Sequence, residues 1–203
     1  MEHLAELILV DPNVEVVRAW SEAFEGEARV RVRHGRFEDL PAYDCLVSPA
    51  NSFGIMDGGV DLAISRFFGW ELMDRVQDRI VREFFGEQPV GTAILVETGH
   101  PAHPWLAHTP TMRVPLDIRG TDNVYSAMLA MLQAVAMFNR TNPAIRSIAC
   151  PGLGTATGRM EPDEAARLMA LAWRVANEPS PRIDWSIARN RQVSVMGGMR
   201  ARG

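Results

Sequence analysis

The sequence contains no lysine, so every one of its 21 basic residues is an arginine. A chain without lysine forms no Schiff base through a side-chain amine and places no P-loop lysine on a nucleotide phosphate. An arginine bias at the coding level is a sufficient cause of this absence. Whatever the cause, mechanisms that need a lysine are excluded for this protein.

Cysteine is nearly absent as well. Cys45 and Cys150 are the two cysteines, and each lies in an apolar, strand-like run, which favours buried reduced thiols over a disulfide. No stretch approaches the roughly 18 consecutive apolar residues of a membrane span, and the first residues lack the basic region and apolar core of a leader. We therefore expect a cytoplasmic protein that does not associate with a membrane.

The charge balance is mildly acidic. The formal net charge is −4 and no basic block occurs, so we expect no non-specific binding of nucleic acids. The chain has 203 residues, of which 47% are hydrophobic, and this is enough for the core of one domain but cramped for two.

We expect a single domain over residues 1–178 and a C-terminal extension over residues 179–203. The extension contains Pro179, Pro181 and a pair of glycines near its end, which predict a loop-like or partly disordered segment. Trp185 and Ile187 are the side chains that can pack part of it against the domain.

Short apolar runs alternate with segments of helical period along the domain. Strands are expected at Leu7–Val10, Val30–Val32, Cys45–Val47, Ala93–Val96, Leu106–His108 and Ser147–Cys150. Helices are expected at Val14–Phe24, Asp61–Phe68, Trp70–Phe85, Val124–Asn139 and from about Pro162 to Asn177. This alternation predicts a three-layer α/β/α fold around a mixed, mainly parallel sheet, with ligands at the carboxyl ends of the strands.

The most informative motif runs from Val47 to Ile64 and reads VSPANSFGIMDGGVDLAI. A strand ends in a polar turn, and paired glycines then lead into a helix, so Asn51 follows a strand end and Asp61 lies at a helix start. Backbone N–H groups of Gly58, Gly59 and Val60 can approach a phosphate there. The structural alternatives are a turn residue for Asn51 and a helix cap for Asp61.

A second glycine-rich loop follows the expected strand Ser147–Cys150. It contains Gly152, Leu153, Gly154, Thr155, Ala156, Thr157 and Gly158. Both glycine loops therefore follow carboxyl ends of strands, where the ligand of a parallel sheet is expected.

These motifs resemble the macro domain family, whose members bind ADP-ribose and in some branches hydrolyse its derivatives. Asn51 matches the second asparagine of the family's first motif, and Gly58 to Asp61 match the end of its glycine run at the same spacing. The second loop looks like the family's second phosphate-binding loop, and the strand that ends in His108 and Thr109 resembles the family's strand ending in His-Thr. The resemblance covers most of residues 28 to 177.

The resemblance implies a macro-domain-like α/β/α fold and a small-molecule ligand, ADP-ribose or a related nucleotide diphosphate-ribose, free or on an ADP-ribosylated substrate. It implies that Ser48, Ala50 and residues 152–158 of the second loop also bind the ligand, and it implies neither a cofactor nor a metal. Asn51 and Asp61 are the catalytic candidates, because they would position the distal ribose and a water. The lysyl intermediate of one glycohydrolase branch is excluded by the absence of lysine.

The chain also departs from the family pattern. Ser48 and Pro49 replace the first asparagine and its neighbour, and Arg36 stands where an aspartate usually takes the adenine amino group. Asp11 and Asp39 are alternative acceptors for that group. Ser65 stands where hydrolase members often carry histidine, and Ala156 and Gly158 stand where a glycine and an aromatic are common.

Three functions remain open: a binding module for ADP-ribose, an ADP-ribosyl hydrolase on the same site, and a macro-like scaffold or regulatory protein that does not bind ADP-ribose. A dinucleotide dehydrogenase is disfavoured because no Gly-x-Gly-x-x-Gly follows the first strand. His100 and His103 lie in a proline-rich loop that favours no metal site. Arg113 suits either a phosphate or a structural salt bridge. The sequence does not indicate an oligomeric state.

Overall fold

The computed structural model describes residues 5–142, 144–178 and 182–200, and they contain one six-stranded sheet in the order β2-β1-β6-β3-β5-β4. Neighbouring strands pair in parallel, except that β4 runs antiparallel to β5. The strands are β1 Glu6–Asp11, β2 Val30–His34, β3 Cys45–Ser48, β4 Ile94–Glu97, β5 Trp105–His108 and β6 Ser147–Cys150.

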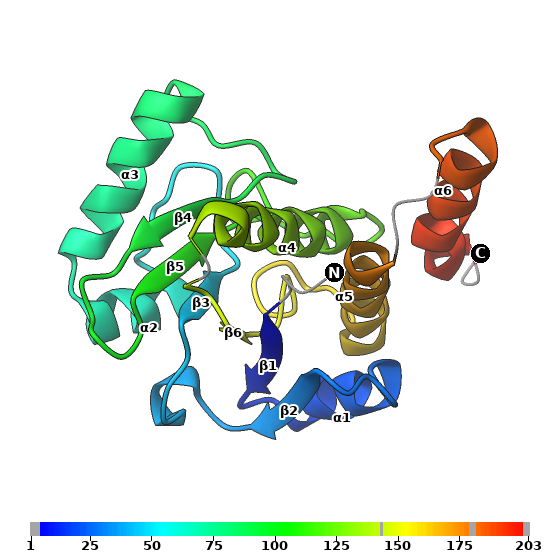
Figure 1. The fold of residues 1–203 in the computed structure, drawn as a ribbon, viewed down its shortest axis with the longest axis horizontal. Coiled ribbons are helices and arrows are strands. Elements are labelled where there is room, and N and C mark those ends of the chain that lie inside the picture. The colour runs from blue at the N-terminus through cyan, green and yellow to red at the C-terminus, as the bar shows by residue number, and fades with distance from the viewer. Residues whose placement is uncertain (1–4, 143, 179–181, 201–203) are drawn as a thin grey trace.

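Helices cover both faces of this sheet, so the predicted three-layer α/β/α architecture is confirmed (Figure 1). They are α1 Val14–Ala23, the short 3₁₀ helix η1 Phe37–Asp39, α2 Gly59–Phe68, α3 Glu71–Phe84, α4 Asn123–Thr141, α5 Pro162–Asn177 and α6 Trp185–Arg200. In the described part of the chain, none of these helices is both long and apolar enough to cross a membrane.

The core has two parts, one on each face of the sheet. Buried side chains of α1, α4 and α5 pack on one face, and those of α2 and α3 pack on the other. Alternation along the strands creates this division, because Cys45 and Val47 face the first group while Leu46 faces the second. Cys45 and Cys150 are free and buried, as predicted, and burial raises the pKa of both thiols.

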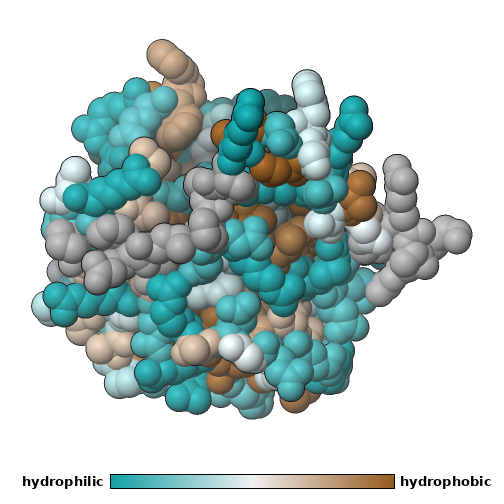
Figure 2. All heavy atoms as spheres, turned by 45° about the vertical axis from the view of Figure 1, so that its right-hand side comes forward, coloured by the Kyte–Doolittle hydropathy of each residue, from teal (hydrophilic) through white to brown (hydrophobic). Residues whose placement is uncertain are grey.

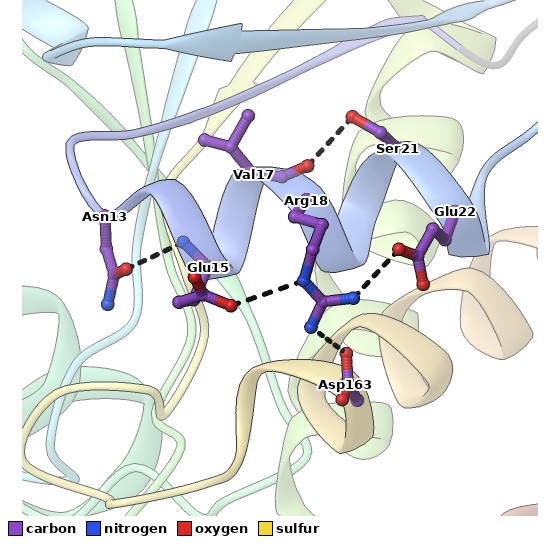
Figure 3. Close-up of polar contacts among 7 residues, drawn as sticks. All are labelled: Asn13, Glu15, Val17, Arg18, Ser21, Glu22 and Asp163. Atoms are coloured by element: carbon purple, nitrogen blue, oxygen red, sulfur yellow. Dashed lines mark hydrogen bonds and ion pairs between the residues drawn. The ribbon is translucent and has the colours of Figure 1, made fainter.

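An arginine on α1 joins that helix to the start of α5. The Arg18 guanidinium donates to Glu15, Glu22 and Asp163, at 3.3, 2.9 and 2.7 Å (Figure 3). Asp163 lies in the first turn of α5, directly after the second glycine loop. Because the Arg18 side chain is 44% exposed, water and salt screen these contacts, and the buried apolar contacts between α1 and α5 stabilise the pair more strongly.

The C-terminal extension differs from the sequence-based expectation. Residues 185–200 form helix α6, whereas the sequence predicts a loop-like tail because glycines have low helix propensity. Trp185 is 79% exposed, and the buried contact is made by Val195, which is 4% exposed. Arg167 of α5 donates to the carbonyls of Ser194 and Val195. Pro179 and Pro181, on which part of the expectation rested, lie outside the described residues.

Most of the other α6 side chains whose burial the structure describes, within residues 185–197, are exposed to solvent. Figure 2 brings this side of the molecule forward and shows a mostly hydrophilic face with apolar side chains among the polar ones. Val193 on α6 is 69% exposed, although it lies only two residues from the buried Val195. The docking of α6 on α5 therefore depends on few side chains.

We predict that Val195→Ala lowers the free energy of unfolding by about 1–2 kcal/mol, because two methyl groups leave a buried site. Val193→Ala is the matched control on the same helix, and it should change stability by less than about 0.5 kcal/mol. Urea unfolding followed by circular dichroism measures both. Equal, small effects would mean that α6 does not pack cooperatively with the domain.

Candidate functional site

A cavity of about 510 Å³ opens at the carboxyl ends of β1, β6 and β3, a volume within the range of about 300–1,000 Å³ found for small-molecule sites. Its lining comes from segments 10–13, 36–38, 49–63, 111–115 and 151–158. The strand order explains this placement, because β6 lies between β1 and β3 and all three run in the same direction. Loops that are far apart in the sequence therefore meet at one edge of the sheet.

Most of the candidate residues lie around this cavity. Those that line it are Asp11, Ala50, Asn51, Gly58, Gly59, Val60, Asp61, Gly152, Gly154, Thr155, Ala156, Thr157 and Gly158. Ser48 and Leu153 do not line it, and both are fully buried. Leu153 belongs to the hydrophobic core, whereas Ser48 reaches the cavity indirectly through Asp61.

The start of α2 presents backbone donors to the cavity. The helix begins at Gly59, two residues earlier than predicted, with Gly58 as its N-cap. Its first intrahelical hydrogen bond runs from the Leu62 N–H to the Gly58 carbonyl, so the N–H groups of Gly59, Val60 and Asp61 precede the helical ladder. Such donors, together with the helix dipole, form an anion-binding site.

The two glycines at this helix start leave open space. A Cβ atom at Gly58 or Gly59 would meet no atom within 4 Å, and only Gly59 has a positive φ, of +55°. Gly58 has a φ of −142°, which any residue adopts. Because Gly58 lines the cavity, a side chain at this position would stand at the cavity without straining the fold.

The glycines of the second loop have a different role. Gly154 has a φ of +71°, and a Cβ there would lie 2.7 Å from Ile118 Cδ1. A Cβ at Gly158 would lie 2.6 Å from the Gly154 carbonyl oxygen, and one at Gly152 would lie 2.5 Å from Thr155 Oγ1. Close packing of the loop thus requires these glycines whether or not a ligand binds.

Asp61 is the most perturbed acid in the cavity. It is 7% exposed, and its Oδ1 accepts a 2.7 Å hydrogen bond from the Ser48 hydroxyl. Burial raises the pKa of Asp61 to about 6, although the Ser48 hydrogen bond opposes the rise. The carboxylate is therefore mostly ionised at neutral pH and basic enough to take a proton.

The Asn51 side chain stabilises the turn that it begins. Its Nδ2 donates to the Ile55 carbonyl at 2.7 Å, and its Oδ1 accepts from the N–H groups of Phe53 and Ile55. Asn51 also forms an isolated bridge with Met112, which brings segment 111–115 beside this turn. The side-chain amide therefore has contacts within its own loop, as the structural alternative predicts, although Asn51 lines the cavity as well.

Asp11 ties the end of β1 to the second glycine loop. One carboxylate oxygen accepts from the Asn13 N–H at 2.8 Å, and the other accepts from the Gly152 N–H at 3.1 Å. Asp39, the other alternative acceptor for adenine, does not line the cavity, whereas Glu38 does. Glu38 pairs with Arg36 at 3.0 Å, and its carboxylate is an acceptor that the motif comparison did not single out.

Within segment 111–115 the sequence analysis singled out Arg113, which does not line the cavity, and missed the residues that do. Thr111, Met112 and Pro115 line the cavity, as does Ile55. Thr111, Met112 and Pro115 lie in an irregular loop outside both glycine motifs, so neither periodicity nor spacing marks them, whereas Ile55 lies inside the motif from Val47 to Ile64. Long-range contacts hold segment 111–115 at the cavity, such as the hydrogen bonds from the Ser52 N–H to the carbonyls of Met112 and Arg113.

The remaining candidates have structural partners. Arg113 forms a bidentate ion pair with Glu87, at 2.6 and 2.9 Å, and Ser65 donates to the Met56 carbonyl. His100 and His103 stack on each other outside the cavity, with ring centroids 4.8 Å apart. Within the described residues, no three histidine, cysteine or acidic side chains are grouped to hold a metal ion.

A second hollow, of about 640 Å³, lies along edge strand β4 between α3 and α4. Arg79 of α3 donates there to the Leu95 carbonyl at 2.9 Å. This contact covers a free backbone acceptor of the sheet edge, which is how proteins protect edge strands. The hollow is larger than the first cavity, but no glycine loop or helix start faces it.

The chain matches known proteins across both glycine loops. A family model described as Macro domain matches residues 47–169. An uncharacterised protein of Aquifex aeolicus is 31% identical over 140 residues, which are 69% of this chain and 78% of the relative. An uncharacterised protein of Aeropyrum pernix is 28% identical over 150 residues, 74% of each chain.

A solved structure, the Oceanobacillus iheyensis macrodomain with ADP, has the same fold. It matches with a TM-score of 0.57 at 19% identity, over 81% of this chain and 90% of that chain. At this identity the likeness shows the arrangement of strands and helices, and the site itself is argued from the residues of this chain.

Two buried groups near the end of β3 make opposite contributions to acid stability. His108 is fully buried beside Ser48 in the sheet register; its Nδ1 lies 2.7 Å from Gln88 Oε1, and burial lowers its pKa to about 3. Its stabilising contribution is present above pH 6.5 and lost as the pH falls towards 3. The contribution of Asp61 is present below pH 3.8 and lost as the pH rises through about 6.

We therefore predict that Asp61→Asn steepens the loss of stability between pH 6 and 4, because it removes the opposing group. His108→Gln should flatten the loss over the same interval. Urea unfolding at several pH values measures the difference from wild type, which should reach a few kcal/mol because one unit of pKa corresponds to about 1.4 kcal/mol. Parallel pH profiles for all three proteins would contradict both assignments.

Proposed function

This chain belongs to the macro domain family, and on this premise we propose that its cavity binds ADP-ribose. The observation that carries the proposal is the pair of glycine loops that face the cavity from the ends of β3 and β6. The first supplies the unpaired N–H groups at the start of α2, which suit a diphosphate. The Oceanobacillus iheyensis macrodomain, which has the same fold, has been solved with ADP, and a point mutant of it has been solved with ADPR.

In this proposal the diphosphate lies between the two loops and the distal ribose lies towards Asn51 and Asp61. The adenosine lies towards Val10 and Phe37, at the end of the cavity that Arg36 and Glu38 also line. Glu38 and Asp11 are the two candidate acceptors for the adenine amino group; each Asp11 oxygen accepts one backbone N–H and keeps a second lone pair.

Backbone donors supply most of the attraction for the diphosphate. The acidic side chains that line the cavity are Asp11, Glu38, Asp57 and Asp61, and the basic one is Arg36. Arg36 is engaged with Glu38, so side-chain charge does not favour an anion. Charge-assisted hydrogen bonds from several N–H groups, each worth about 1.5–3 kcal/mol, are needed to offset this balance.

We predict that Gly58→Glu weakens ADP-ribose binding on the order of 10²-fold, because it places bulk and a negative charge where the diphosphate lies. The open space around Gly58 leaves the fold intact. Calorimetry with ADP-ribose measures the change in Kd.

Gly197→Glu is the matched control, since a Cβ there also meets nothing within 4 Å and Gly197 lies on α6, away from the cavity. It should bind ADP-ribose as wild type does. Undiminished affinity in folded Gly58→Glu would remove the helix start from the site. Glycines of the second loop are poor test positions, because substitution there disturbs packing.

Hydrolysis of ADP-ribosyl derivatives is a second candidate function, favoured by the near-neutral pKa of Asp61. A water that attacks the anomeric carbon of the distal ribose would give its proton to the Asp61 carboxylate. The bond from that carbon to the acceptor would break, and the acceptor would leave with the bonding electrons and take up a proton. Asn51 would shape the turn beside the ribose, because its amide is bonded within the loop.

If the protein is a hydrolase, Asp61→Asn should slow release of ADP-ribose from ester-linked and N-linked substrates about 10²-fold or more, while ADP-ribose affinity changes little. Ser48→Ala is a second, milder variant that keeps the Asp61 carboxylate. It removes a hydrogen bond that lowers the pKa of Asp61, so this pKa should rise. The acid limb of the pH–rate profile should then move to higher pH.

The outcomes separate the three candidate functions. If the wild-type protein binds ADP-ribose but hydrolyses neither substrate class, it is a binding module. If it neither binds ADP-ribose nor hydrolyses a substrate, it is a scaffold or regulatory protein. Turnover that survives Asp61→Asn unchanged would contradict the role given to this carboxylate.

A further inference from the structure

The charges of the chain are distributed unevenly between the domain and its C-terminal extension. Residues 179–203 contain five arginines and one acidic residue, Asp184, whereas residues 1–178 contain 16 arginines and 24 acidic residues. The extension therefore has a formal charge of +4 and the domain one of −8. The total of −4, on which the expectation of no non-specific nucleic-acid binding rests, combines two parts of opposite sign.

The arginines of the extension differ from many of those in the domain. The Arg18 guanidinium of α1, for example, lies 2.7 Å from Asp163 Oδ1. In the part of the extension that the structure describes, Arg182, Arg189 and Arg191 are exposed, and no ion pair or side-chain hydrogen bond to another described residue engages them. Their charges are therefore available to an anionic partner.

The acidic residue of the extension caps helix α6. Asp184 Oδ1 accepts from the Ile187 N–H at 3.0 Å, and the Asp184 carbonyl accepts from the Ala188 N–H at 3.1 Å. A carboxylate in this position satisfies helix N–H donors and interacts with the positive end of the helix dipole. The capping contact therefore leaves the nearby arginines without a local counter-charge.

An exposed tryptophan lies between two of these arginines. Trp185 is the first residue of α6 and is 79% exposed. Arg182 precedes it by three residues, and Arg189 follows it by one helical turn, on the same side of α6. Among the described residues, no aromatic ring or guanidinium stacks on the Trp185 indole. We call Arg182, Trp185 and Arg189 the basic surface.

The chemistry of the basic surface suits unpaired bases and phosphates. An open indole can stack on a base while guanidinium groups contact the phosphates on either side. A membrane fits less well, because Arg189 lies between Trp185 and Val193 on one side of α6 and interrupts the apolar face that an interfacial helix buries. The carboxylates of an acidic polypeptide would match the charge but offer no base for the indole.

We propose that the basic surface binds single-stranded nucleic acid, with phosphates on Arg182 and Arg189 and one base stacked on Trp185. A duplex binds less tightly, because its bases are stacked on one another. Helix α6 lies beyond α5 at the edge of the molecule (Figure 1), and the acidic domain repels phosphates, so the site covers only a few nucleotides. This inference does not depend on what the cavity binds.

The test measures binding of a fluorescein-labelled oligothymidylate of about 12 nucleotides to the full chain by fluorescence anisotropy. We expect a Kd on the order of 10⁻⁵ M at about 50 mM salt and weaker binding as the salt concentration rises. Binding of an unlabelled oligothymidylate should also quench part of the tryptophan emission, because the base stacks on an exposed indole.

The double variant Arg182→Gln with Arg189→Gln should weaken binding about tenfold or more at about 50 mM salt. The slope of log K against log salt should become shallower by about 1.4, because each phosphate contact of a single strand contributes about 0.7. Arg33→Gln with Arg146→Gln is the matched control, since it removes the same charge from two exposed arginines of the domain. The control should bind within about twofold of wild type.

Trp185→Ala should weaken binding about fivefold or more, abolish most of the quenching and leave the salt slope unchanged. Trp70→Ala is the matched control, because Trp70 is 48% exposed and lies at the start of α3. It should change neither the affinity nor the quenching. Because all the substituted side chains are exposed, circular dichroism should show an unchanged fold.

Several results would overturn the proposal. They are no binding of oligothymidylate at about 50 mM salt, equal or tighter binding of a duplex, the same loss in the Arg33 and Arg146 control, or full affinity in Trp185→Ala. Phosphatidylglycerol vesicles and polyglutamate are the competing partners. If either binds more tightly than oligothymidylate and depends on the same side chains, the basic surface belongs to a membrane or to an acidic protein instead.

Discussion

The parallel pairing of β6 with both β1 and β3 is the constraint on which the cavity depends. It brings three strand ends from distant parts of the sequence to one edge of the sheet. Two hydrogen bonds then fix the loops that leave these ends. Asp11 at the end of β1 holds the Gly152 N–H, and Ser48 at the end of β3 holds the Asp61 carboxylate. Both contacts require the register of the central strands, so the loops cannot be arranged independently of the sheet.

The same constraint explains how an acidic cavity can hold an anion. Asp11 uses both carboxylate oxygens to accept backbone hydrogen bonds, and Asp61 is buried with Ser48 as its partner. Each of these carboxylates accepts hydrogen bonds from the protein, Asp11 from two backbone N–H groups and Asp61 from the Ser48 hydroxyl. The N–H groups at the start of α2 are the positive ends of its peptide dipoles, and they face the cavity. Backbone N–H donors close to the ligand can therefore outweigh the formal charges of the surrounding acids. The hydrogen bonds that Asp11 and Asp61 accept already offset part of the negative charge of these two acids.

Much of this arrangement could be predicted from the sequence, because the buried faces of strands and helices produce apolar residues at a characteristic spacing. The run Ser147–Cys150 and the helical period of Pro162–Asn177 predicted elements with the same bounds as in the structure. The contributions of Leu153 and of segment 111–115 could not be predicted, because Leu153 is a core residue inside a glycine loop and Met112 reaches Asn51 through a single isolated bridge. Helix α6 was missed because its glycines disfavour a helix, whereas packing of Val195 is a tertiary effect.

The glycines show why residue type alone does not define a site. Gly58 leaves open space at the cavity mouth, whereas a Cβ at Gly158 would meet the Gly154 carbonyl at 2.6 Å and Ile118 at 2.8 Å. Ile118 therefore fills the volume next to position 158, where the family resemblance implies a common aromatic. Ile118 also donates its N–H to the Gly158 carbonyl, so its side chain and its backbone both fix the second loop.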